Sequence, residues 1–226
     1  MPIGSIINAG AIIAGSSVGL LLHKGIPNKV KHIVFQALGL STVLIGVQMA
    51  LKVQNILIVI FSLLLGAIAG EVINLEGNVE KFGNLLKKSV KSDNHLFTDG
   101  FVAASVLFCI GALAILGPLN EGLKGDRTIL LTKSLLDGFS SIAFASTYGI
   151  GVMFSVIPLL IYQGSITFLS SYLQPIMTPV VISQLTAVGG LLIIGIGLSL
   201  LEIKKIKVTN MLPALLLVII LSIIIK

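Results

Sequence analysis

The sequence contains little of what soluble enzymes and disulfide-stabilised proteins depend on. It has one cysteine, no tryptophan, three histidines and only 11% charged residues in 226 positions. Because Cys109 is the single thiol, neither an intramolecular disulfide nor a thiol metal cluster can form. The histidines lie in or beside expected loops without metal-ligand spacing, and none lies near a nucleophile in an apolar segment. We therefore expect no metal site, no cofactor and no enzymatic activity.

The shortage of charge is matched by an excess of apolar residues, which make up 55% of the chain and give a mean hydropathy of +1.08. A soluble domain cannot sustain this composition, so the lipid bilayer is the expected surrounding. Eight apolar stretches approach the length of about 20 residues that a helix needs to cross a membrane core of about 30 Å. They cover residues 4–22, 32–51, 55–75, 99–117, 128–148, 149–170, 180–201 and 209–225.

The stretches are continuous and do not alternate with a period of two, so they predict helices rather than a closed barrel. We expect an all-α bundle of about eight transmembrane helices in a single domain, residues 1–226. The junction around residues 146–149 is the weakest boundary. If the fifth and sixth stretches merge there, the bundle has seven helices.

Membrane topology explains the net charge of +6 better than a nucleic-acid partner does, because the lysines are spread over loops without a binding motif. Ten of the fifteen basic residues follow the first, third and seventh stretches. These ten are Lys24, Lys29, Lys31, Lys81, Lys87, Lys88, Lys91, Lys204, Lys205 and Lys207. Basic loops face the cytoplasm, so eight crossings predict a multi-pass protein of the inner (plasma) membrane with both termini outside.

One polar linker, residues 76–98, interrupts the apolar sequence. Its glycines, lysines and glutamates predict a solvated cytoplasmic connector, with a short amphipathic surface helix as the alternative. The linker separates a first block, residues 1–75, from the rest of the chain.

The chain also contains an internal similarity. Residues 52–57 (KVQNIL) resemble residues 207–212 (KVTNML), and shorter matches upstream keep the same order. Helices one to three, in residues 1–75, thus correspond to helices six to eight, in residues 149–226. Equivalent helices are an odd number of crossings apart, so the second copy is inverted. Inverted repeats are typical of secondary transporters, although apolar sequences also match by chance and some channels share such duplications.

The central helix pair between the copies, residues 99–148, carries the densest set of polar residues. Lys133 and Asp137 lie within the fifth stretch, where an ionisable side chain costs about 2.5 to 3.5 kcal/mol on insertion scales. Four residues apart, they share one face of the helix. They are either a pair that neutralises itself so that the helix can insert, or residues that line a wet path.

Further pathway candidates flank this pair. We place Asn120, Glu121 and Asp126 in the loop before the fifth helix, where they would gate or coordinate at an outer mouth. Asn8, at the start of the first helix, and Glu71, at the end of the third, are second-rank mouth residues.

Small residues form another face of the fifth helix. Ser134 and Ser141 join the predicted pathway, although with Gly138 and Ala145 they also form a face that lets another helix approach closely. The same packing role explains most of the 24 glycines, and a homodimer seam is one use of such faces.

The motifs resemble those of a known family. They are Asn120-Glu121-Gly122, residues 130–137 (LLTKSLLD), residues 187–192 (AVGGLL) and residues 210–215 (NMLPAL). On these elements, which cover nearly the whole chain, it resembles the YqgA-type family of bacterial inner-membrane proteins, a domain of unknown function. The resemblance implies a full-length membrane domain and draws attention to the same central motif, but it implies no substrate.

Two functions fit these observations. The first is a transporter or channel-like protein for a small solute or ion, in which Asp137 is the cation or proton partner and Lys133 its counter-ion. The second is a non-transporting scaffold or sensor that acts through the cytoplasmic loop, residues 76–98. Substrate, direction and coupling ion do not follow from the sequence.

Overall fold

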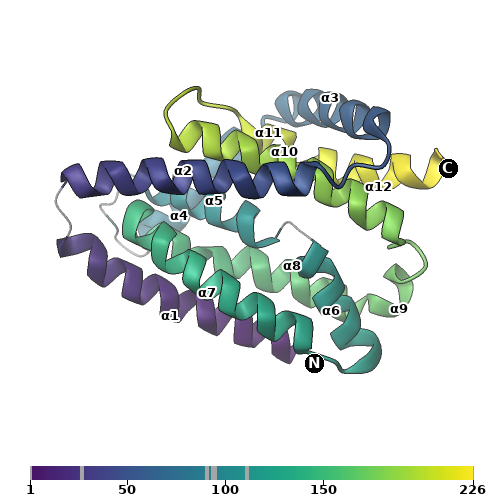
Figure 1. Ribbon diagram of the computed structural model, residues 1–226, viewed down its shortest axis with the longest axis horizontal. Coiled ribbons are helices and arrows are strands. Elements are labelled where there is room, and N and C mark those ends of the chain that lie inside the picture. The colour runs from purple at the N-terminus through teal and green to yellow at the C-terminus, as the bar shows by residue number, and fades with distance from the viewer. Residues whose placement is uncertain (1, 26–27, 90–91, 93–95, 110–111, 226) are drawn as a thin grey trace. The chain divides into compact units, whose positions relative to one another are not determined.

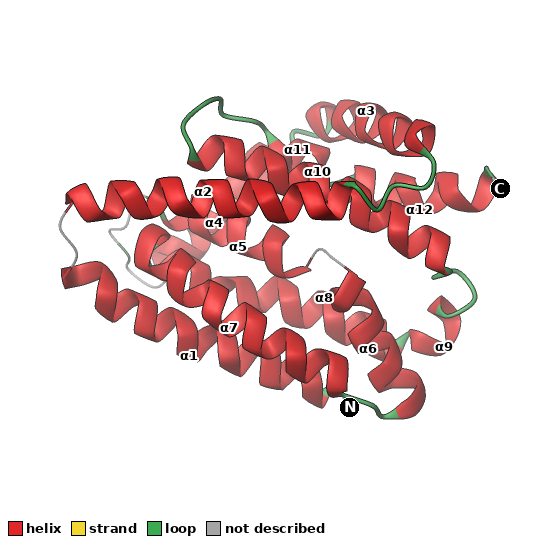
Figure 2. Cartoon of the chain, in the orientation of Figure 1, coloured by secondary structure: helices red, strands yellow, loops and turns green. Residues whose placement is uncertain are grey.

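The computed structural model describes residues 2–25, 28–89, 92, 96–109 and 112–225. These residues form helices joined by short loops, and no strand is found among them (Figure 2). In chain order the helices are α1 (Ile3–Gly25), α2 (Asn28–Ala50), α3 (Ile56–Val72), α4 (Leu75–Ser89), α5 (Phe97–Cys109), α6 (Ala112–Lys124), α7 (Thr128–Tyr148), the 3₁₀ helix η1 (Ile150–Ser155), α8 (Val156–Phe168), α9 (Ser170–Leu173), α10 (Pro179–Leu200), α11 (Val208–Met211) and α12 (Ala214–Ile224). The all-α class expected from the sequence is confirmed.

Several of these helices are suited to a membrane. Four segments are long and apolar enough to cross it: Ile3–Leu22, Thr128–Tyr148, Ile150–Phe168 and Pro179–Leu200. Two bent helix pairs, α3 with α4 and α5 with α6, raise the number to six if each pair is one span. Two further apolar helical segments, Gly39–Ala50 and Val208–Ile224, are shorter. The chain is a helical membrane protein.

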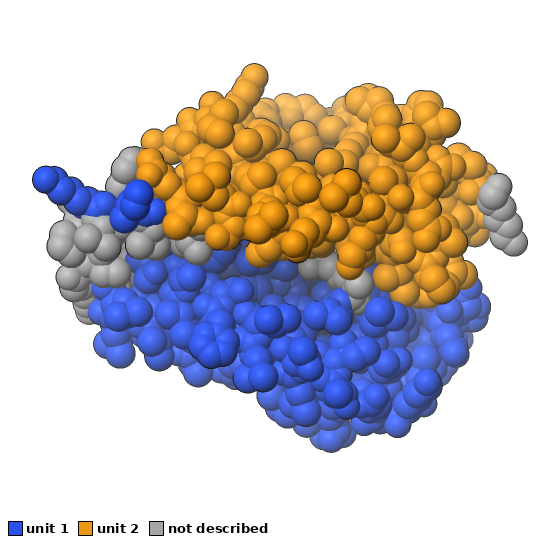
Figure 3. Space-filling model, in the orientation of Figure 1, with its two compact units in different colours: residues 1–34, 83–175 blue, residues 35–82, 176–226 orange. Residues whose placement is uncertain are grey.

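The chain folds into two compact units (Figure 3). Unit 1 comprises residues 1–34 and 83–175, and unit 2 comprises residues 35–82 and 176–226. Each unit therefore joins segments that are distant in sequence, and α4 starts in unit 2 and ends in unit 1.

In unit 1, α1 and α7 lie side by side and run in the same direction (Figure 1). Gly4 lies against Leu130 near the start of both helices, and Gly19 lies against Ala145 near the end of both. A side chain at Gly15 would collide with the backbone carbonyl of Gly138, so only hydrogen fits there. The face of small residues predicted on α7 is thus the face that α1 approaches closely.

The fourth apolar stretch, expected as one helix over residues 99–117, is two helices. α5 ends at Cys109, and α6 begins at Ala112 and continues to Lys124, with an angle of 57° across the pair. α6 also contains Pro118, whose ring nitrogen cannot donate a helical hydrogen bond. Asn120 and Glu121 are therefore helical residues of α6 and do not lie in a loop as expected.

The boundary between the fifth and sixth stretches is a real break. α7 ends at Tyr148, and Gly149 adopts a φ of 82°, which residues other than glycine rarely adopt. The chain then forms η1 before α8 begins. The two segments do not merge into one helix.

Unit 2 contains two pairs of antiparallel helices that pack closely. Gly39 of α2 lies against Leu201, and Gly46 lies against Gly190 of α10. α3 packs against α12 and α11, with Gly66 against Ala214 and Gly70 against Asn210. These glycines therefore serve contacts within one chain, and a homodimer stays a prediction.

The polar linker contains a helix. α4 covers Leu75–Ser89 with one polar and one apolar face and ends in Lys87 and Lys88, which suit the negative end of a helix dipole. The segment therefore follows the alternative expectation, an amphipathic helix, over most of its length. His95 and the residues around it lie outside the described residues.

Candidate functional site

Lys133 and Asp137 form an ion pair on α7, in the interior of unit 1. Their side chains are only 6% and 10% exposed. Asn8 of α1 donates from its amide nitrogen to Oδ2 of Asp137 at 2.9 Å, so this oxygen accepts from both the amide and the ammonium group. The parallel packing of α1 on α7 brings Asn8 to the pair from 129 positions away. The sequence predicted the pair but not this third partner.

The thiol of Cys109, the last residue of α5, is within electrostatic range of both Lys133 and Asp137. Tyr162 of α8 is in turn within electrostatic range of Cys109.

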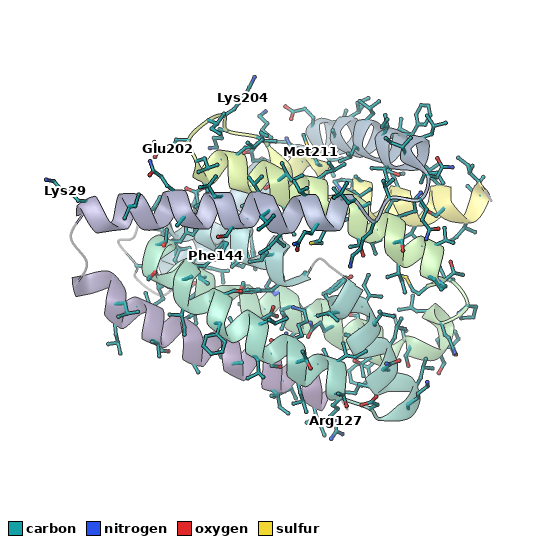
Figure 4. The ribbon with its side chains drawn as sticks, in the orientation of Figure 1. Lys29, Arg127, Phe144, Glu202, Lys204 and Met211 are labelled. Atoms are coloured by element: carbon teal, nitrogen blue, oxygen red, sulfur yellow. The ribbon has the colours of Figure 1, made fainter. Side chains whose placement is uncertain are left out.

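Glu121 forms a second buried group at the start of α1. Its Oε1 accepts from the backbone amide of Gly4 at 2.8 Å and from Nε of Arg127 at 2.9 Å. The Glu121 side chain is 2% exposed, whereas that of Arg127 is 41% exposed and extends away from the ribbon (Figure 4). Arg127 therefore joins a buried carboxylate to the surface of the protein.

The other residues of the predicted mouth are not part of these clusters. Asp126 is exposed and accepts from the backbone amide and the hydroxyl of Thr128. These two hydrogen bonds, the backbone one first, lower the pKa of Asp126. Asn120 is half-buried one residue before Glu121. The structure brings neither of them to Lys133 or Asp137 by a hydrogen bond or ion pair that it describes.

The two serines of the predicted pathway use their hydroxyl groups in helix packing. Ser134 donates to the carbonyl of Leu130 in its own helix. Ser141 donates to the carbonyls of Gly138 and, across the helix contact, of Ile12 in α1. Ser134 thus bonds within α7, and Ser141 also joins α7 to α1.

Glu71 lies in unit 2, at the end of α3. It is exposed, accepts from Lys207 at 2.9 Å and also accepts from the amide of Asn210. The hydrogen bond to Glu71 raises the pKa of Lys207. The side-chain oxygen Oδ1 of Asn210 accepts from the backbone amide of Glu76, so this cluster fixes the start of α4. Glu71 and Asn8, both expected at mouths, belong to different units.

Buried polar atoms without a hydrogen-bond partner concentrate in unit 1. Seven such side-chain atoms occur among the described residues, and six of them lie in unit 1. They are Ser5 Oγ, Asn8 Oδ1, Ser16 Oγ, Glu121 Oε2 and both Oε1 and Nε2 of Gln163, with Ser222 Oγ in unit 2. Gln163 is fully buried on α8.

Comparison with known proteins decides the family. The model of a family described as "Protein of unknown function (DUF554)" matches residues 3–223. The chain belongs to this family. It is 40% identical over 217 residues to the "Uncharacterized membrane protein YdfK" of Bacillus subtilis (strain 168), covering 94% of this chain and 92% of the relative. It is 39% identical over 222 residues to the "Uncharacterized protein YqgA" of Escherichia coli (strain K12), covering 96% and 94%.

The resemblance expected from the sequence motifs is thereby confirmed. No solved structure matches the chain. Within the part of the chain that the structure describes, no group of three or more histidine, cysteine, aspartate or glutamate side chains is arranged to hold a metal ion.

Proposed function

We propose that this DUF554 protein moves a small solute or ion across the inner (plasma) membrane, along a path in unit 1 that passes Lys133 and Asp137. The observation that carries the proposal is the burial of this ion pair inside an apolar membrane helix. Each charge raises the cost of insertion by about 2.5 to 3.5 kcal/mol, and apolar residues of similar volume replace buried pairs without loss of stability. Insertion alone therefore gives no reason to retain the pair.

The unpartnered atoms support a wet interior. Buried polar groups in proteins are nearly always hydrogen-bonded, and ordered water supplies the partner where protein does not. Six such atoms in unit 1 against one in unit 2 support water or a polar ligand in unit 1. On this view unit 2 is the supporting part and unit 1 contains the path.

The helix pairings support the inverted repeat. The repeat makes α1 equivalent to α8, α2 to α10, and α3 to α11 and α12. Equivalent helices share a unit and pack against each other, and the last two pairs are antiparallel. An inverted repeat related by a two-fold axis in the membrane plane would produce this pairing.

The orientation that follows can be tested by labelling in whole cells. With Cys109 replaced by serine, a cysteine at Lys124 should react with a membrane-impermeant maleimide, since this loop faces outside together with both termini. A cysteine at Lys204, in a basic loop, should react only after the cells are permeabilised. The reverse pattern would refute the proposed orientation, and labelling of both sites from outside would refute the number of crossings.

The transport proposal is tested by charge movement in proteoliposomes. On a solid-supported membrane, jumps of H⁺, Na⁺, K⁺ or Cl⁻ concentration should produce a current with the wild-type protein. The variant Lys133→Met with Asp137→Leu removes both charges together and should abolish that current. Asp99→Asn, which changes an exposed carboxylate of the same unit, is the matched control and should retain it. A folded double variant with wild-type current would remove the pair from the mechanism.

A further inference from the structure

Two buried carboxylates contact successive turns at the start of α1. The amide of Gly4 donates to Glu121, and the side chain of Asn8 donates to Asp137. Four residues of α-helix rise about 6 Å, so the two contact points are one helical turn apart. The carboxylates come from different helices, α6 and α7, and reach α1 from 117 and 129 positions away.

Three acceptor atoms remain unused within this turn. They are Oε2 of Glu121, Oγ of Ser5 and Oδ1 of Asn8, all buried and without a hydrogen-bond partner. Ser5 is fully buried and follows Gly4 directly in the chain. A buried water makes about three hydrogen bonds, and these atoms supply acceptors for water between the two carboxylates. A serine hydroxyl also donates while it accepts, so it can pass a proton onward.

The groups around these carboxylates favour a proton over a metal cation. Arg127 contacts Glu121 and Lys133 contacts Asp137, so a fixed cation already neutralises each carboxylate. From the other packed helices, Cys109 of α5 lies within electrostatic range of the Lys133–Asp137 pair, and Tyr162 of α8 lies within range of Cys109. A metal cation needs several ligands, and in the described part of the chain no group of three or more histidine, cysteine, aspartate or glutamate side chains is arranged to hold one. A proton needs only one carboxylate oxygen.

We propose that Glu121 and Asp137 are the two ends of a proton relay across the first turns of α1, through Ser5 and water positioned by Asn8. This inference rests on the proposed transport function and names the proton as its ion. In the step, the O–H bond of the Glu121 acid breaks and its proton passes to water. At the other end of the relay, a water or hydroxyl group gives up a proton, which forms the O–H bond of the Asp137 acid. Glu121 becomes a carboxylate beside Arg127, and the ammonium of Lys133 is left beside a neutral partner.

Proton flux into proteoliposomes that contain the pH dye pyranine tests the relay, with valinomycin and K⁺ setting the membrane potential. Glu121→Gln keeps an acceptor for Gly4 but cannot exchange a proton, and should reduce flux at least about tenfold, as expected for loss of an acid–base group. Ser5→Ala should reduce flux by a smaller factor. Ser222→Ala, an equally buried and unpartnered hydroxyl in unit 2, is the matched control and should leave flux unchanged.

A second measurement needs no variant. Flux through the wild-type protein should be slower in D₂O than in H₂O, because bonds to the transferred hydrogen break along the relay. Wild-type flux in Glu121→Gln, or equal rates in the two solvents, would refute the relay. If the wild-type protein instead carries Na⁺, K⁺ or Cl⁻ but no protons, the relay is refuted and the transport function stands. If no ion jump produces a current, the transport function itself fails.

Discussion

Replacing Lys133 with methionine while Asp137 stays is expected to lower the free energy of unfolding by about 3 to 5 kcal/mol, because it leaves an unpaired buried charge. Asp137→Leu alone should lower the free energy of unfolding by a similar amount, since the ammonium of Lys133 then loses its partner in a largely closed site. Changing both residues together should restore stability to within about 1 kcal/mol of the wild type, because apolar side chains of similar volume tolerate such sites. Unfolding in mixed detergent micelles with increasing SDS measures these differences.

Stability and current, measured on the same double variant, distinguish a structural role of the pair from a role in transport. Recovery of stability in the double variant, together with loss of current, would show that the pair is retained for transport and not for folding. Single variants as stable as the wild type would contradict this expectation, because they would mean that neither charge depends on the other.

Much of the fold follows from the sequence for physical reasons. Lipid requires continuous apolar helices, so the bounds of α7 agree with the stretch expected at residues 128–148, and α10 differs from its stretch by one residue at each end. The close approach at Gly138 and Ser141 also follows, because small side chains at helical spacing leave room for another backbone. The insertion cost of a charge in an apolar helix is enough to single out Lys133 and Asp137 from the sequence alone.

Other features depend on contacts that are distant in sequence. Nothing near Asn8 indicates Asp137 as its partner, because that contact arises only when α1 and α7 pack in parallel. Glu121 was expected in a loop because it lies beyond the apolar stretch that ends at residue 117. Its carboxylate is buried in α6 because Gly4 and Arg127 both donate to it.

The division of the fourth stretch into α5 and α6 was missed for a similar reason. Hydropathy is averaged over a window and does not register where one apolar helix ends and the next begins. The local signal Gly117-Pro118 does not mark the division, because both residues lie inside α6. The small-residue pattern predicted where helices meet, but it could not tell which helices meet.

If the buried pair is in contact with water, the native cysteine should reveal it. Cys109 is half-buried and lies within electrostatic range of both charges. A hydrophilic methanethiosulfonate reacts with the thiolate, which forms in water and not in lipid. This reagent is expected to modify Cys109 in native membranes from at least one side, and more slowly in the Lys133→Met, Asp137→Leu variant. Complete protection from both sides, in protein that reacts fully once it is denatured, would contradict it.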